Sequence, residues 1–119
     1  MNWYKYAKDF HDRNIINHKI RYLESIKSTI KCLSDMVFQS GTLAKNSNMN
    51  IISSQKISSY PDLRDILIEA DSIALDSPWK FSDLCVEAID SIDRNISALK
   101  KERDDINSGN KYKFQKGWI

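Results

Sequence analysis

Apolar residues recur at helical spacing through much of the first forty positions. They lie at Ile16, Ile20, Leu23, Ile26, Ile30, Leu33 and Val37. Steps of three and four keep side chains on one face of an α-helix. The spacing predicts a helix over 14–40, either continuous with a helix over 3–12 or separated from it by the polar run 12–14. Gly41 is well placed to end it, because glycine tolerates the left-handed conformation common after helices.

Residues 42–60 show no helical period and are rich in Ser and Asn. This composition predicts a long loop, within which residues 50–53 could form a brief strand. Loops of this length in small domains are usually either mobile or part of a binding site.

Two further helices are predicted beyond this loop. Pro61 suits the first turn of a helix over 61–75, whose apolar face is Leu63, Ile66, Leu67, Ala70, Ile73 and Ala74. Pro78 suits the first turn of a helix over 78–107, with Ser77 as its N-cap. The apolar positions of this last helix follow a heptad-like spacing; they are Phe81, Cys85, Ala88, Ile92, Ile96, Leu99 and Ile106. Gly109 is expected to end it, which leaves an extended tail over 110–119.

These elements predict one all-α domain, residues 1–119, built as a small bundle of two long helices and one short helix. Its seam is expected to resemble a coiled coil, with the aromatic termini packed on it. Each long helix would measure about 40 Å at about 1.5 Å per residue, so the short helix covers only part of each apolar face. The uncovered part predicts a homo-oligomer or a helical protein partner. The expected interface residues are Ile20, Leu23, Ile30, Ile92, Ile96 and Leu99.

Charge is arranged in blocks along the chain. Residues 1–59 carry 9 Lys and Arg against 4 Asp and Glu, residues 60–93 carry 2 against 9, and residues 94–119 carry 7 against 3. The interpretation that we favour is that the acidic block packs beside the basic ones, so that their fields largely cancel. The alternative is a basic face that remains free for nucleic acid.

Aromatic residues gather at the two ends of the sequence. Seven of the twelve lie in the first ten or last eight positions, namely Trp3, Tyr4, Tyr6, Phe10, Tyr112, Phe114 and Trp118. Tyr112 and Phe114 alternate with lysines at strand period, a pattern that can stack bases while ammonium groups meet phosphates. The candidates for nucleic-acid binding are Lys5, Lys8, Lys113, Lys116, Tyr112, Phe114 and Trp118. The alternative, which we favour, is that both ends dock on the bundle, since aromatic rings bury large areas.

One short stretch, Arg13 to His18, reads R-N-x-x-x-H. It resembles the signature of the HEPN family of helical ribonucleases. The resemblance implies a dimer in which Arg13 holds an RNA phosphate and His18 assists proton transfer, with Asn14 as the polar residue after the arginine. The alternative is that these are solvated residues beside the first apolar turn. Convergence of Arg13 and His18 requires a helix to begin here, because positions five apart on a regular helix point about 140° apart.

Other site chemistry has little support in the sequence. His11 and His18 would lie about 10 Å apart on a helix, too far for one metal ion, and the glycines stand alone rather than in a phosphate-binding loop. We expect no metal, no cofactor and no small-molecule substrate. The absence of a long apolar run and of a secretory signal pattern predicts a cytoplasmic protein without a membrane partner. The abundance of Ile, Lys, Ser and Asn is typical of an AT-rich genome, such as that of a phage or a bacterium.

The sequence therefore predicts a non-enzymatic structural or adaptor protein that acts through helix-helix contacts. Nucleic-acid binding through the basic aromatic ends is the alternative, with or without a HEPN-like ribonuclease activity at Arg13 and His18.

Overall fold

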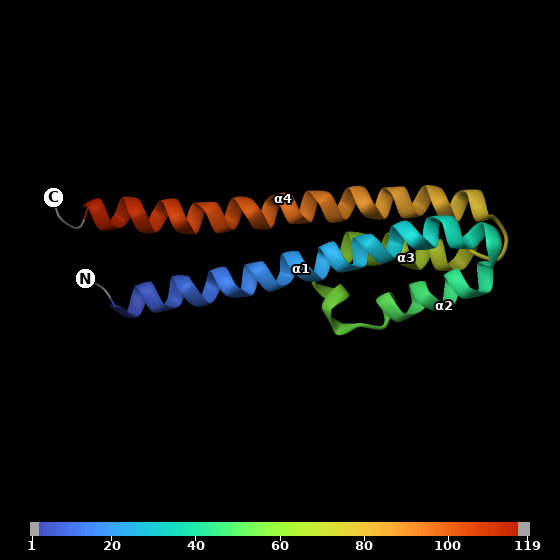
Figure 1. Ribbon diagram of the computed structural model, residues 1–119, viewed down its shortest axis with the longest axis horizontal. Coiled ribbons are helices and arrows are strands. Elements are labelled where there is room, and N and C mark those ends of the chain that lie inside the picture. Colours follow the sequence, from blue (N-terminus) through green and yellow to red (C-terminus); the bar gives the residue numbers. More distant parts are fainter. Residues whose placement is uncertain (1–2, 117–119) are drawn as a thin grey trace. The chain divides into compact units, whose positions relative to one another are not determined.

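The computed structural model describes the backbone of residues 3–116 and the side-chain surroundings of residues 3–108. Along this part of the chain it contains four α-helices, a short 3₁₀ helix and no strand (Figure 1). The elements are α1 (Trp3–Gln39), α2 (Gly41–Ile52), η1 (Gln55–Ser59), α3 (Pro61–Ile73) and α4 (Pro78–Lys116). The all-α fold is confirmed, with four α-helices in place of the three predicted.

The chain divides into two compact units, where the sequence predicted one domain. Unit 1 combines the part of α1 up to Leu23 with the part of α4 from Asn95 onward. Unit 2 comprises residues 24–94. The long helices α1 and α4 contribute to both units, whereas α2, η1 and α3 belong to unit 2 alone.

Unit 2 is an up-and-down bundle in which each α-helix runs antiparallel to the one before it (Figure 1). Short connections favour this arrangement because they return the chain beside the helix it has just left. Sixteen of the twenty hydrophobic residues buried in the described part of the chain belong to this unit. The predicted stripe of the first helix is fully buried from Ile16 to Val37.

The segment predicted as a loop is helical, and that prediction is wrong. Ser40 caps α2 by accepting a hydrogen bond from the backbone N–H of Leu43 at 3.2 Å. Ala44, Asn48 and Ile51 are buried, at helical steps of four and three. The predicted strand at 50–53 is also wrong, because α2 runs to Ile52. A polar side chain in the middle of the buried face concealed the helical period.

Gly41 begins α2 instead of ending α1, which stops at Gln39. A Cβ atom on Gly41 would lie 2.9 Å from the backbone oxygen of Ala74. No Gly φ in the described chain is positive. The position therefore requires glycine because the start of α2 approaches the residue after α3 closely.

The predicted starts of the last two helices are confirmed at Pro61 and Pro78. Ser77 caps α4, since its hydroxyl accepts a hydrogen bond from the backbone N–H of Lys80 at 3.2 Å. The extended tail is wrong, because α4 continues past Gly109 to Lys116. Residues 112 and 114 therefore belong to a helix, and the strand-like spacing predicted for them is wrong.

Unit 1 is a pair of antiparallel helical segments. The buried hydrophobic residues in its described part are Ile16, Ile20, Leu23 and Ile96. Two hydrogen bonds link the segments: Arg13 Nη1 donates to Asn107 Oδ1 at 2.8 Å, and Arg103 Nη1 donates to Asn17 Oδ1 at 2.9 Å. The helix α1 is continuous through the polar run 12–14.

The N-terminal aromatic residues do not dock on the protein, which corrects the prediction for this end. Trp3 is 70% exposed and Phe10 is 54% exposed, with Tyr4 and Tyr6 also exposed. At about 100° per residue, Trp3, Tyr6 and Phe10 share a face that is turned by roughly 100° from the line of Ile16 and Ile20. The core face and the aromatic face of α1 are therefore different faces.

Candidate functional site

The HEPN-like residues lie within α1, ten residues or more from its first residue, Trp3. Arg13 contacts Asn107, and its guanidinium carbon lies 6.0 Å from the centre of the Phe10 ring. His18 is exposed, with Nδ1 3.3 Å from Arg21 Nη2. Because the backbone is regular helix here, Arg13 and His18 point about 140° apart. The chain does not bring the two side chains together, and Asn14 is exposed beside them.

The residues predicted to meet a partner are mostly inside the chain itself. Ile20, Leu23, Ile30, Ile92 and Ile96 are buried, and Leu99 is half-buried. In unit 2 the segment predicted to be a loop forms α2 and η1, which bury side chains of their own. The expectation that the short helix leaves the seam open is therefore wrong for unit 2. A partner could reach buried Ile30 and Ile92 only by displacing helices of this chain.

No group of three or more His, Cys, Asp and Glu side chains lies close enough to hold a metal ion among the described residues. None of the described helices combines the length and the apolarity needed to cross a membrane.

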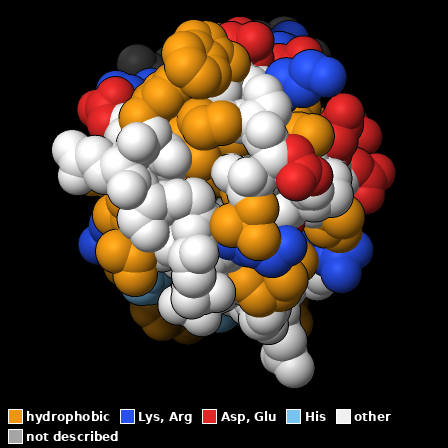
Figure 2. Space-filling model, turned by 90° about the vertical axis from the view of Figure 1, so that its right-hand side faces the viewer, with side chains coloured by type: hydrophobic (Ala, Val, Ile, Leu, Met, Phe, Trp, Pro, Cys, Tyr) orange, Lys and Arg blue, Asp and Glu red, His pale blue; other side chains and the backbone are white. Residues whose placement is uncertain are grey.

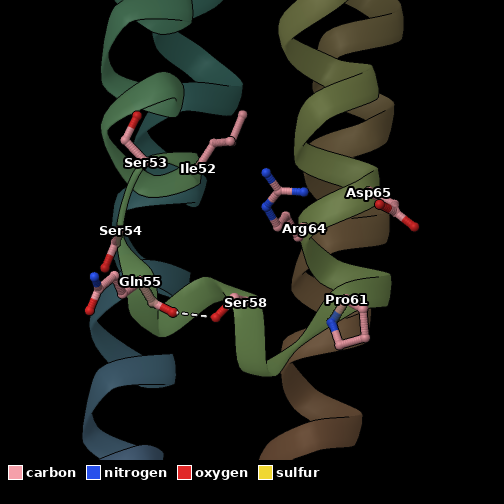
Figure 3. Close-up of a pocket in the computed structure, with 8 residues that line it drawn as sticks. All are labelled: Ile52, Ser53, Ser54, Gln55, Ser58, Pro61, Arg64 and Asp65. Carbon is pink, nitrogen blue, oxygen red and sulfur yellow. Dashed lines mark hydrogen bonds between the residues drawn. The ribbon is translucent and has the colours of Figure 1, made fainter.

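A pocket of about 470 Å³ lies between the end of α2, η1 and the start of α3 (Figure 3). Serines and the first turns of α3 line it, and Ser58 Oγ donates to the backbone oxygen of Gln55 at 2.6 Å. Arg64 points toward the end of α2, whereas Asp65 points away from it (Figure 3). A cation near a helix C-terminus balances its partial negative charge. This arrangement accounts for Arg64 without a ligand.

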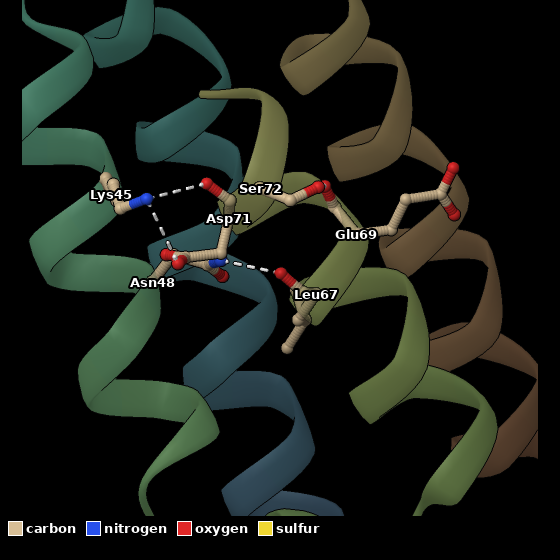
Figure 4. A network of polar contacts seen from close by, with 6 residues as sticks. All are labelled: Lys45, Asn48, Leu67, Glu69, Asp71 and Ser72. Carbon is tan, nitrogen blue, oxygen red and sulfur yellow. Dashed lines mark hydrogen bonds and ion pairs between the residues drawn. The ribbon is translucent and has the colours of Figure 1, made fainter. Parts of the chain in front are cut away.

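A buried polar cluster joins α2 to α3 (Figure 4). Asn48, which is 1% exposed, donates from Nδ2 to the backbone oxygen of Leu67 at 2.8 Å. Lys45 Nζ donates to the backbone oxygen of Asp71 at 3.3 Å and lies 3.7 Å from its Oδ2. The Oδ1 atoms of Asn48 and Asp71 have no hydrogen-bond partner. The donors of Asn48 and Lys45 on α2 both bond to backbone oxygens of α3. Because hydrogen bonds depend on direction, the cluster fixes how α2 pairs with α3.

The two cysteines differ in environment. Cys85 is buried in unit 2, and loss of solvation on burial raises the pKa of its thiol from 9.0 to about 12. Cys32 is exposed. A thiol that stays protonated is a poor nucleophile, so Cys85 acts as a core residue.

Exposed apolar side chains gather at one end of unit 2. This end, where α1 passes to α2 and α3 passes to α4, presents Phe38, Leu43, Leu75 and Trp79, which we call the end patch. The Phe38 and Trp79 rings meet edge to face with centroids 5.2 Å apart, yet they remain 49% and 72% exposed. Figure 2 views this end and shows its hydrophobic side chains, with acidic and basic groups around them. The pair is stacked without being covered.

Acidic side chains predominate around the end patch. Asp76 follows Leu75, Asp35 lies one turn before Phe38, and Asp83 lies one turn after Trp79. All three are exposed, and Lys80 is the exposed basic neighbour on α4. The patch therefore offers an apolar centre with a mainly negative rim.

A second exposed apolar surface lies on unit 1. Trp3, Tyr6 and Phe10 form what we call the aromatic face of α1, at steps of three and four. Lys5 and Lys8 belong to the same turns. Of the other predicted nucleic-acid candidates, Lys113, Lys116, Tyr112 and Phe114 lie beyond the described side chains, and Trp118 lies outside the described residues.

The two units carry opposite net charge. Unit 1 has 11 Lys and Arg against 5 Asp and Glu, which gives +6, whereas unit 2 has 7 against 11, which gives −4. The acidic block 60–93 lies within unit 2, whereas the basic block 1–59 is divided between the two units.

Comparison of the chain with protein-family models, with curated proteins and with solved structures finds no match. The surfaces described above are therefore interpreted on their own chemistry.

The end patch could not be predicted from the sequence, because its residues are far apart in the chain. Phe38 and Trp79 are 41 positions apart, and only the four-helix arrangement brings them together. A signal was nevertheless present: each of the four residues stands within four positions of a predicted helix boundary and off the predicted buried stripe.

Proposed function

We propose that the protein is a non-enzymatic structural or adaptor protein that acts through helix-helix contacts, with the end patch as its partner-binding surface. The observation that supports this is the stacked but uncovered pair of Phe38 and Trp79 beside exposed Leu43 and Leu75. The exposed area of these four side chains is on the order of 400 Å², which is within the range that marks functional patches on monomers.

The residues of the predicted coiled-coil-like seam have a different role in this proposal. They hold the chain's own helices together, so that the ends of those helices present the patch at a fixed geometry. Aromatic residues are favoured at protein interfaces because they combine a large apolar area with few rotatable bonds. A cytoplasmic setting, with both cysteines free, is part of the same proposal.

Site-specific photocross-linking tests this role directly. A benzophenone amino acid at position 79 is expected to give a discrete protein adduct in cells, whereas the same group at exposed Asn50 or Ser59, toward the other end of unit 2, is expected to give little. Identical adduct patterns from all three positions, or none from position 79, would contradict the proposal.

Nucleic-acid binding is a second candidate, favoured by the exposure of the aromatic face, with Arg13 beside Phe10, on a unit of charge +6. Lys5 and Lys8 lie on the other side of α1 and add to the positive charge of the unit. Exposed rings can stack on unpaired bases while lysines neutralise phosphates. Such binding should weaken steeply with salt and should be lost in Trp3→Ala/Phe10→Ala. If the affinity for single-stranded RNA is the same at high salt and in the Trp3→Ala/Phe10→Ala variant, nucleic-acid binding through this face is ruled out.

A further inference from the structure

We propose that the occupant of the end patch is the aromatic face of a second copy of this chain, so that copies associate head to tail. This inference rests on the proposed function and names its partner. It has two separate supports on the described chain, one in the geometry of α1 and one in charge.

The geometry of α1 suits it as a docking helix. Trp3, Tyr6 and Phe10 occupy positions i, i+3 and i+7 of one helix face, which is the spacing of anchor residues when a helix binds an apolar surface. All three rings are exposed, and the core of unit 1 uses the separate face that carries Ile16 and Ile20. The aromatic face can therefore be covered without any change in unit 1.

Charge complementarity selects the end patch as its counterpart. The rim of the patch carries Asp35, Asp76 and Asp83 against Lys80. The cation of the aromatic face is Arg13, which lies about 50° from the centre of that face and has its guanidinium carbon 6.0 Å from the centre of the Phe10 ring. Lys5 and Lys8 point to the opposite side of α1. The units themselves have net charges of +6 and −4. Two copies of the same patch would place carboxylates against carboxylates, which disfavours a symmetric contact through the end patch.

The expected association is weak. The exposed area of about 400 Å² on the patch is roughly half of what one partner contributes to a stable interface. The contact joins two different surfaces, so each chain has one surface to give and one to receive. Mass should therefore rise with concentration.

The test is the weight-average mass of the full-length protein by light scattering from about 10 μM to 1 mM. We expect a value near the 13.8 kDa of one chain at the low end, and at least a roughly twofold increase at the high end. The increase should shrink in about 0.5 M salt, because the charges around both surfaces are exposed and screened.

Two variants each remove one surface. Trp79→Ala removes a ring from the end patch, and Trp3→Ala/Phe10→Ala removes two from the aromatic face. Each variant alone should stay at 13.8 kDa, but a mixture of the two should form a one-to-one dimer, since each keeps the surface that the other lacks. Recovery in the mixture also demonstrates that both variants are folded.

Matched controls are present on the same helices. Tyr4, which is exposed but lies about 100° from Trp3 around α1, and Met49, which is exposed toward the end of α2 away from the patch, can each be changed to alanine. Both control variants should associate as the parent protein does.

A mass that stays at one chain at 1 mM, or single variants that associate as well as the parent, would overturn the inference. A dimer that forms from Trp79→Ala alone would do the same. If the protein is monomeric yet position 79 still cross-links to a different protein, the self-association fails and the proposed function stands. If position 79 gives no adduct either, both fail.

Discussion

At the residue scale, residues of the same type differ in how deeply they are buried. Cys32 is exposed and Cys85 is buried, Asn46 is exposed and Asn48 is buried, and Gly41 differs from its neighbour Thr42 in what surrounds it. These pairs provide internal controls, because the two members share chemistry or a helix and differ in burial.

The two thiols should react very differently. Ellman's reagent is expected to titrate one thiol, Cys32, in the native protein and two after denaturation, because Cys85 is buried and remains protonated at neutral pH. Two fast-reacting thiols in the native protein would show that α4 does not pack at Cys85 as described.

Cys85 also gives stability a dependence on high pH. Its thiol has a pKa raised from 9.0 to about 12 by burial, so the folded state holds this proton more strongly than the unfolded state. The contribution is complete below pH 9 and is lost as the pH rises toward 12. Relative to Cys85→Ala, the parent protein should therefore lose free energy of unfolding between pH 9 and 11, and parallel curves would contradict this.

Gly41→Ala should destabilise the protein by about 1–2 kcal/mol, although alanine favours helices. The added Cβ would meet the Ala74 backbone oxygen at 2.9 Å, and backbone cannot rotate away as a side chain can. Thr42→Ala on the next, exposed position should change the free energy of unfolding by less than about 0.5 kcal/mol. Equal urea midpoints for both variants would rule out the close approach.

Asn48→Ala should cost about 2 kcal/mol, because it removes a buried hydrogen bond and leaves a cavity. The bond lost is the one from Nδ2 to the Leu67 backbone oxygen. Asn46→Ala, on the exposed side of the same helix, should be neutral or slightly stabilising, since alanine has the higher helix propensity. Denaturant unfolding of the two variants makes the comparison, and a neutral Asn48→Ala would mean that α2 does not pack on α3 through this residue.

At the element scale, helices with an apolar stripe and a proline or serine at their start could be predicted from the sequence. The stripe from Ile16 to Val37 is buried, and Pro61, Pro78 and Ser77 act as expected. What could not be predicted was α2, because its buried face includes Asn48 and its sequence contains three asparagines, a serine and a glycine among twelve residues, which are poorer helix formers. The continuation of α4 past Gly109 was missed for a related reason, since one glycine costs a helix only about 1 kcal/mol.

The candidate surfaces were predictable only in part. The exposure of the N-terminal aromatic residues depends on α1 running unbroken through residues 12–14, because only then is their face turned by roughly 100° from the line of Ile16 and Ile20. The end patch depends on two helix connections, α1 to α2 and α3 to α4, meeting at one end of unit 2. The spacing of residues within one predicted helix does not settle either feature.

The two units should differ in local stability, which is a prediction about elements rather than residues. Unit 1 buries four hydrophobic side chains in its described part, compared with sixteen in unit 2. Segments with few buried apolar contacts open locally at a small free-energy cost. Hydrogen exchange of the full-length protein should therefore be faster for amides of residues 5–20 than for those of residues 26–37 in the same helix α1, and uniform protection along α1 would contradict this.

At the scale of the whole molecule, the chain combines an acidic four-helix unit that ends in an apolar patch with a basic helical pair that carries an exposed aromatic face. Neither surface contains a constellation suited to catalysis among the described residues, and both have the composition of docking surfaces. Opposite charge on the two units gives copies of the chain a reason to associate in one orientation rather than at random.

The most direct measurement of this account is the accessibility of Trp79 as the only tryptophan, in a Trp3→Phe/Trp118→Phe protein that keeps an aromatic ring at position 3 and is first shown by light scattering to associate as the parent does. Acrylamide quenching should be efficient at about 1 μM, because the ring is 72% exposed, and should fall as the concentration approaches about 1 mM and the end patch becomes covered. Efficient quenching at every concentration would contradict docking of a second copy, and a ring already protected at 1 μM would contradict the exposed end patch itself.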